Sequence, residues 1–201
     1  MRSNTQRTKQ RRQDAETDKV GEWIMQEACQ GQPILCIDTR EPEGSGWEPF
    51  LTLPVIRKKL DVGDFSLVGC ESLISIERKS LSDLISCFCG ERDRFTRELQ
   101  KFQAVPDRWI ICEGNYGDLL RGNYRSAMNP KSAWESGIAL MTRFHIPLLM
   151  AGDIKTAATL AQSLLVRWYR EHVSVIETVA KAMKEMTEQS NGCEGNSCSR
   201  D

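Results

Sequence analysis

The order of short apolar runs and amphipathic segments along the chain restricts the fold more than any other sequence feature. Alternation and apolar content predict strands over 34–38, 51–60, 61–68, 73–79, 108–114 and 146–152. Helical spacing predicts helices from Ser80, over 91–102, over 129–144 and, as one helix or two, over 154–183. Strands that come first and then alternate with helices indicate an α/β domain, in which helices flank a mixed central sheet.

Composition is typical of a soluble globular protein, and the chain divides into three regions. Of 201 residues, 40% are hydrophobic and 27% are charged. We see neither an apolar run long enough to span a membrane nor a secretory signal, so we expect an intracellular protein, cytoplasmic or, in a eukaryote, nuclear. Residues 32–171 are predicted to form the globular domain. Residues 1–31 are expected to form a basic, partly disordered arm with a short helix, and 172–201 a C-terminal helix and disordered tail.

Cysteines and net charge exclude few functions. The eight cysteines lack the paired spacing of a structural zinc site, and we expect reduced thiols. A net charge of −1 does not force attraction to nucleic acid. Basic residues do precede the first acidic one, as Arg2, Arg7, Lys9, Arg11 and Arg12. This arm is either a solvated segment or a tail that contacts phosphate, and both interpretations stay open.

Three of the predicted strands carry a carboxylate near one end. Along 73–79, alternation places Glu77 and Lys79 on one face, opposite the isoleucines. Asp38 ends one apolar strand, and on the predicted strand 61–68 Asp64 takes the face opposite Phe65 and Leu67. Carboxylate oxygens are ligands that Mg²⁺ prefers, so Asp64 and Glu77, with Asp38 as third or outer ligand, are candidate metal ligands. Lys79 is a candidate for orienting a metal-activated water or stabilising charge on a phosphate.

A purely structural interpretation is equally concrete. Ser80 and Asp83 fit the first and last positions of a helix capping box. Glu77 and Lys79 would then form an exposed ion pair, worth roughly 0–1 kcal/mol. Asp64 would be an ordinary turn aspartate. This interpretation does not account for three strand ends that each carry a carboxylate.

The combined spacing resembles the signature of a known family. Gly63-Asp64, twelve residues, Glu77-Arg78-Lys79, three residues and Asp83 resemble the GD-Xn-ERK-XXX-D motif of the XPF family of structure-specific DNA endonucleases. CIDTRE, with Asp38, Arg40 and Glu41, is similar to that family's first motif. The resemblance covers roughly residues 32–171.

The resemblance implies a restriction-endonuclease-like core and assigns roles. It implies metal binding by Asp38, Asp64 and Glu77, catalysis by Lys79, and support of the site by Arg40, Glu41, Arg78 and Asp83. Mg²⁺ is the expected cofactor, and Mn²⁺ is expected to substitute. Family members are usually dimers built through late helices, so 154–183 is expected either to form a homodimer contact or to pack on its own sheet.

Basic residues flank the predicted site. Arg57, Lys58 and Lys59 precede Asp64, and Arg92, Arg94, Arg97 and Lys101 lie on the predicted helix 91–102. We predict that they face DNA, with a merely solvated helix face as the alternative.

The sequence therefore predicts a metal-dependent endonuclease that cuts branched, flap or fork DNA. Two alternatives stay open: a non-catalytic DNA-binding or scaffold subunit with the same fold, and a hydrolase of another phosphodiester.

Overall fold

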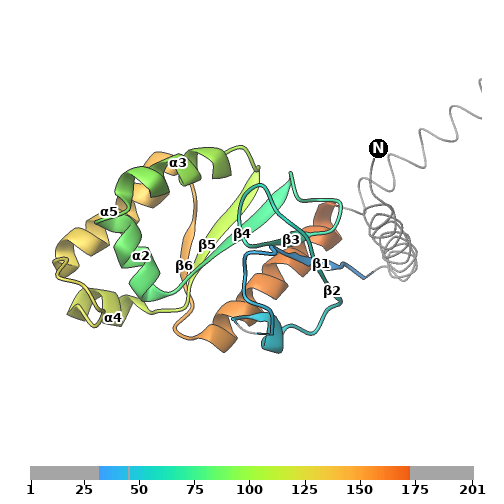
Figure 1. The fold of residues 1–201 in the computed structure, drawn as a ribbon, viewed down its shortest axis with the longest axis horizontal. Helices are drawn as coiled ribbons and strands as arrows, with labels where there is room; N and C mark the ends of the chain where they lie inside the picture. Colours follow the sequence, from blue (N-terminus) through green and yellow to red (C-terminus); the bar gives the residue numbers. More distant parts are fainter. Residues whose placement is uncertain (1–31, 45, 173–201) are drawn as a thin grey trace, which may run out of the picture. The chain divides into compact units, whose positions relative to one another are not determined.

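The computed structural model describes residues 32–44 and 46–172 (Figure 1). Three predicted segments lie outside the described residues: the basic arm, the tail beyond residue 172 and the second part of the helical stretch 154–183. The predicted homodimer contact therefore lies partly outside them.

A six-stranded mixed sheet forms the centre of the fold, as predicted (Figure 1). Its strands are β1 (Leu35–Ile37), β2 (Val55–Arg57), β3 (Phe65–Leu67), β4 (Ile74–Lys79), β5 (Asp107–Cys112) and β6 (Leu148–Met150). Their order across the sheet is β2-β1-β3-β4-β5-β6. β3 runs antiparallel to β1 and β4, and all other neighbours are parallel. The start of β3 therefore lies at the same edge as the ends of the other strands.

Helices connect and flank this sheet. They are the short 3-10 helix η1 (Glu48–Phe50), α2 (Leu81–Phe88), α3 (Arg92–Phe102), α4 (Tyr116–Arg121) and α5 (Pro130–Phe144). Taken by itself, the segment 154–172 is also helical. The parallel pair β4–β5 requires a crossover, which α2 and α3 supply. Buried side chains of α2, α3 and α5 form one apolar core with β5 and β6, among them Leu84, Phe95, Leu99, Ile110, Leu140 and Leu148.

Polar N-cap residues mark the first residue of three helices. Ser80 caps α2 by accepting a hydrogen bond from the Asp83 amide. Asn129 caps α5, and Pro130 occupies the first position of the helix. Proline suits this position because it has no amide hydrogen that would be left without an acceptor. Helix α4, which the sequence did not reveal, begins after a third such cap at Asn115. Short helices of this kind lack the periodic apolar pattern by which longer ones are recognised.

Three predicted strands are clearly shorter than expected, and one of them, predicted over 146–152, is a strand only over Leu148–Met150. The segment predicted over 51–60 is a strand only over Val55–Arg57, and it pairs with β1 alone. Pro54 precedes it and cannot donate to a ladder, which fits this edge position. Residues 61–64, predicted as strand, form a turn before β3. The described cysteines are free thiols, as expected. Among the described residues, no helix is long and apolar enough to cross a membrane.

Candidate active site

A cleft of about 320 Å³ lies between β4 and α3 at the shared strand edge. The turn before β3, the end of β4, helix α3 and Arg40 line it. Its polar lining consists of Arg40, Asp61, Asp64, Glu77, Lys79, Arg94, Glu98 and Lys101. The cleft thus brings together four of the predicted site residues, Arg40, Asp64, Glu77 and Lys79.

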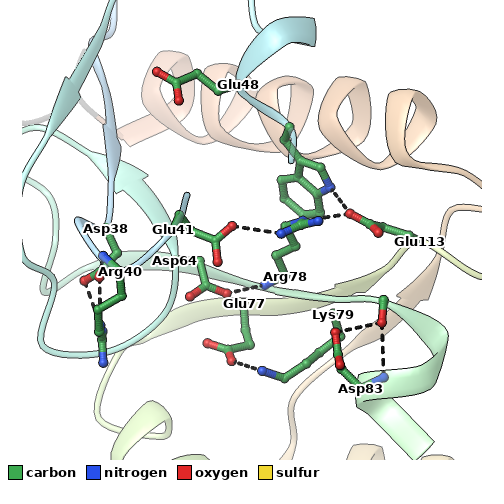
Figure 2. A network of polar contacts seen from close by, with 12 residues as sticks. Asp38, Arg40, Glu41, Glu48, Asp64, Glu77, Arg78, Lys79, Asp83 and Glu113 are labelled. Atoms are coloured by element: carbon green, nitrogen blue, oxygen red, sulfur yellow. Dashed lines mark hydrogen bonds and ion pairs between the residues drawn. The ribbon is translucent and has the colours of Figure 1, made fainter. Parts of the chain in front are cut away.

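Alternation along β4 places two of these side chains. Ile76 is fully buried, whereas Glu77 and Lys79 both reach the cleft. The Lys79 ammonium donates to the Glu77 carboxylate across 2.5 Å (Figure 2). Burial disfavours the ammonium, but the charges of Glu77 and Asp64 outweigh it and raise the pKa of Lys79. Lys79 is therefore a fixed positive charge inside the cleft.

Asp64 reaches the same cleft from the turn before β3. Its Oδ2 accepts a hydrogen bond of 2.8 Å from the Arg78 amide (Figure 2). Burial, followed by the negative charge of Glu77, raises the pKa of Asp64 to about 8. The Arg78 amide and Lys79 act in the opposite direction and do not cancel this effect. Asp64 and Glu77 therefore repel each other whenever both are ionised.

Gly63 explains why the predicted motif requires glycine before the aspartate. Its φ of +74° lies in the left-handed region. A Cβ atom there would lie 2.0 Å from Ser75 Oγ and 3.3 Å from the Phe102 ring. Any larger residue would push the turn away from β4, and the turn carries Asp64.

Both carboxylate oxygens of Asp38 accept hydrogen bonds from groups of the protein. Its Oδ1 accepts from the Arg40 amide and Nε, both at 2.7 Å. Its Oδ2 accepts from Arg40 Nη2 at 3.0 Å and from the Leu60 amide at 2.6 Å. Asp38 is fully buried; although burial alone would raise its pKa, hydrogen bonds from Arg40 and Leu60 lower it.

The predicted set of three carboxylate ligands is not assembled in this arrangement. Arg40 lines the cleft, whereas Asp38 is not among the lining residues. Within 32–44 and 46–172, no three His, Cys, Asp or Glu side chains are grouped so that they could hold a metal ion. Metal binding by Asp38 stays a prediction, and the structure gives this residue a second task, which is to hold Arg40.

Arg78 points to the opposite face of β4 from Glu77 and Lys79. Its Nη1 donates to Glu41 at 2.9 Å, and its Nε donates to Glu113 at 2.7 Å (Figure 2). The Trp47 indole donates to the same Glu113 oxygen at 2.9 Å. Glu41 and Arg78, both predicted site residues, thus meet in a network beside the cleft. Glu113 and Trp47 were not predicted.

Asp83 has a local structural role. Its amide donates to Ser80 Oγ, and Ser80 Oγ in turn donates to the Asp83 carboxylate at 2.7 Å. The capping role predicted for Ser80 is therefore confirmed. The Asp83 carboxylate accepts a hydrogen bond from the Ser80 hydroxyl, whereas a capping box would have it accept from the Ser80 amide. Asp83 is exposed and is not among the cleft residues.

The predicted DNA-facing residues divide between the cleft and other surfaces. Arg94 lines the cleft, where it pairs with Glu91 at 2.5 Å and Glu98 at 3.6 Å. Lys101 of α3, also predicted to face DNA, lines it as well, whereas Arg97 is exposed and is not among the lining residues. Arg92 is exposed at the start of α3.

The remaining three basic residues lie around β2. Arg57 pairs with Glu48 and also donates to the Glu41 carbonyl. Lys58 pairs with Glu71, and Lys59 is exposed. Lys58 and Lys59 line a second hollow, which shares Asp61, Val62 and Lys101 with the cleft.

Comparison with known proteins places this geometry in a family. The ERCC4 domain family matches residues 37–164. No curated protein sequence matches the chain significantly. The solved structure of XPF from Aeropyrum pernix is 28% identical, with a TM-score of 0.56, over 73% of this chain and 69% of that chain. XPF from Aeropyrum pernix in complex with DNA is 26% identical, with a TM-score of 0.56, over 70% of this chain and 66% of that one. The chain therefore belongs to the ERCC4 domain family and contains an XPF-type nuclease domain.

Proposed function

We propose that this protein is a Mg²⁺-dependent endonuclease that hydrolyses phosphodiester bonds in branched DNA, such as flaps and forks. The observation that carries the proposal is the cleft in which Asp64 and Glu77 lie beside the protonated Lys79. Family membership and the DNA complex of a related XPF structure support DNA as the substrate.

The chemistry of the cleft fits a divalent cation. Asp64 and Glu77 offer hard oxygen ligands, which Mg²⁺ prefers. The pKa of Asp64 is raised to about 8 partly because Glu77 repels its charge, and a cation between them relieves that repulsion. When bound, Mg²⁺ lowers the pKa of a coordinated water and stabilises charge on a phosphoryl oxygen.

The protein's own side chains complete the reaction. Lys79 stabilises the negative charge that builds on the phosphoryl oxygens as the water oxygen attacks phosphorus and the bond to the leaving sugar oxygen breaks. The water loses a proton to solvent, and the leaving oxygen takes one up from solvent. Arg40, Arg94 and Lys101 line the cleft and hold neighbouring phosphates. Because Arg94 pairs with Glu91 and Glu98, binding a phosphate requires it to exchange one of these partners.

The test uses the full-length purified chain with Mg²⁺ and end-labelled flap, fork and linear duplex DNA. We expect cleavage of the branched substrates in preference to the duplex, and none by Asp64→Asn or Lys79→Ala variants. Failure to cut any substrate, or equal cutting by the variants, would contradict the proposal. DNA binding that ignores Mg²⁺ and leads to no cleavage would instead favour a non-catalytic DNA-binding subunit.

Homodimer formation is a separate proposal, supported only by the family resemblance. Sedimentation of the full chain at several concentrations tests it, and a monomer at every concentration would contradict it.

A further inference from the structure

Glu113 contacts the strand of the candidate site twice, from the end of β5. Its amide donates to the Lys79 carbonyl at 2.9 Å, which continues the pairing of β4 with β5. Its side chain crosses to Arg78, where Oε1 accepts from Nε at 2.7 Å. The same oxygen accepts from the Trp47 indole at 2.9 Å (Figure 2). One carboxylate oxygen therefore joins β5, β4 and the segment after β1.

These contacts are enclosed. Side-chain exposure is 16% for Glu113 and 21% for Arg78, and Trp47 is fully buried. The Trp47 ring stacks on Phe65 of β3, with ring centroids 4.7 Å apart. Gly46 lies against the guanidinium, since a Cβ atom there would come within 3.2 Å of it. A guanidinium held this tightly has little freedom to move, and neither has its backbone.

The position of the Arg78 backbone matters for the cleft. Its amide donates to Asp64 Oδ2. Among the described contacts, no second donor binds the Asp64 carboxylate. Glu113 is not among the residues that line the cleft. The Glu113 side chain therefore acts on the cleft through its partners Arg78 and Trp47, of which Arg78 is the one that bonds Asp64.

We propose that Glu113 is a positioning residue, which fixes the Arg78 backbone so that Asp64 and Glu77 are held ready to bind one divalent cation. This inference rests on the proposed function, because it needs the cation site. The negative charge of Glu113 is part of the role: a charge-assisted hydrogen bond to a guanidinium is about twice as strong as a neutral one. Residues that orient metal ligands from behind typically change affinity or activity by about 10–100-fold when replaced.

The test uses a Glu113→Gln variant of the full chain, in which glutamine keeps the shape of the Glu113 side chain but removes its negative charge. Mn²⁺ binding is measured by isothermal titration calorimetry without DNA, and cleavage is measured separately. We expect Mn²⁺ affinity to fall about 10-fold or more and kcat to fall to a similar extent, with KM for DNA within about threefold of the original. A role limited to stability would lower the melting temperature and leave Mn²⁺ affinity unchanged, and that result overturns the proposal.

Glu48→Gln is the matched control. Glu48 pairs with Arg57 at 2.8 Å, and their side chains are 26% and 21% exposed, so the broken ion pair is similar in length and burial. It does not contact Arg78 directly, and we expect unchanged Mn²⁺ affinity. An equal loss in both variants would mean that any half-buried ion pair has this effect, which also overturns the proposal.

Trp47→Phe keeps the proposal testable if Glu113→Gln does not fold. Phenylalanine keeps an aromatic ring to stack on Phe65, and it removes the indole donor to Glu113 together with the five-membered ring. We expect Mn²⁺ affinity to fall severalfold, and an unchanged affinity would contradict the proposed role.

Asp64→Asn separates a failure of the metal site from a failure of the role proposed for Glu113. If the unmodified chain binds Mn²⁺ no better than Asp64→Asn, the proposed metal site itself fails. If it binds better but Glu113→Gln binds equally well, only the role of Glu113 fails.

Discussion

The two faces of β4 each place one cation beside two carboxylates, but the ion pairing differs between them. On the cleft face, Asp64 and Glu77 repel each other, and Lys79 neutralises only part of their charge. On the other face, Arg78 is enclosed by two carboxylates, Glu41 and Glu113, with each hydrogen bond near 2.8 Å. Consecutive residues of one strand thus separate ligand binding from structural support. We call the cleft face unbalanced because Lys79 pairs with Glu77 and Asp64 accepts only a backbone amide among the described contacts, and we call the other face balanced because Arg78 pairs with both of its carboxylates. We expect the unbalanced face to take up a cation and phosphate, whereas the balanced face holds the strand in place.

The largest expected effect is on cleavage, and it belongs to the unbalanced face. Asp64→Asn keeps an oxygen that can accept from the Arg78 amide but removes the charge that binds a cation. We expect cleavage of flap DNA to fall by at least about a thousandfold, because charge stabilisation is the largest single contribution to such catalysis. Single-turnover rates at saturating Mg²⁺ measure this effect. A loss smaller than tenfold would mean that the cleft is not the site of reaction.

The second effect is on stability, and it belongs to the balanced face. Arg78→Ala leaves Glu41 and Glu113 without their shared partner, and breaking a buried ion pair from one side typically costs about 3–5 kcal/mol. We expect the free energy of unfolding in urea to fall by about this amount. A loss below about 1 kcal/mol would show that the two carboxylates are well solvated without Arg78, and the contrast between the faces would disappear.

The third effect is a dependence of stability on pH without metal. The pKa of Asp64 is about 8 in the folded chain and near 3.8 when unfolded. The folded state therefore holds the proton more tightly, so this group's contribution is complete below about pH 4 and is lost as pH rises towards 8. Asp64→Asn mimics the protonated form at every pH. In EDTA at pH 8, we expect it to melt roughly 5–10 °C above the unmodified chain.

Calorimetric scans in EDTA between pH 4 and pH 8 measure this difference. The gap between the two proteins should close near pH 4, and Mg²⁺ should narrow it at pH 8 by neutralising Asp64. If Asp64→Asn is equally or less stable at pH 8, the cleft is not under the electrostatic strain described above.

The smallest effect concerns the cap that directly follows β4. Ser80→Ala removes the acceptor for the Asp83 amide and should cost about 1 kcal/mol in urea unfolding. Asn129→Ala at the start of α5 is the matched control, because its side chain caps the Lys131 amide in the same way. Both variants should cut DNA at rates within about threefold of each other. A much slower Ser80→Ala would give Asp83 a role at the site, as the family motif implies.

Local patterns were sufficient to predict part of this site. Strand alternation alone put Glu77 and Lys79 on one face, and their ion pair confirms it. The glycine before Asp64 and the cap at Ser80 also follow from rules that act over a few residues. The mixed sheet was predictable because its strands and helices have distinct periods.

Contacts between distant segments were not predictable in this way. Asp38 accepts from Leu60, which lies 22 residues away, and the position of that amide depends on how the chain turns after β2. Trp47 and Glu113 are 66 residues apart, and only the sheet order brings them together. A signal for Glu113 did exist: it follows the apolar end of β5 as Asp38 follows β1. Its partners could not be read from that signal.

The central claim is that Asp64 and Glu77 hold a divalent cation next to Lys79. The most direct measurement is an anomalous difference map from crystals of the chain grown with Mn²⁺. The account predicts a peak bonded to carboxylate oxygens of both Asp64 and Glu77, with the Lys79 ammonium beside it. A cleft without a peak while Mn²⁺ binds elsewhere on the chain would contradict the claim.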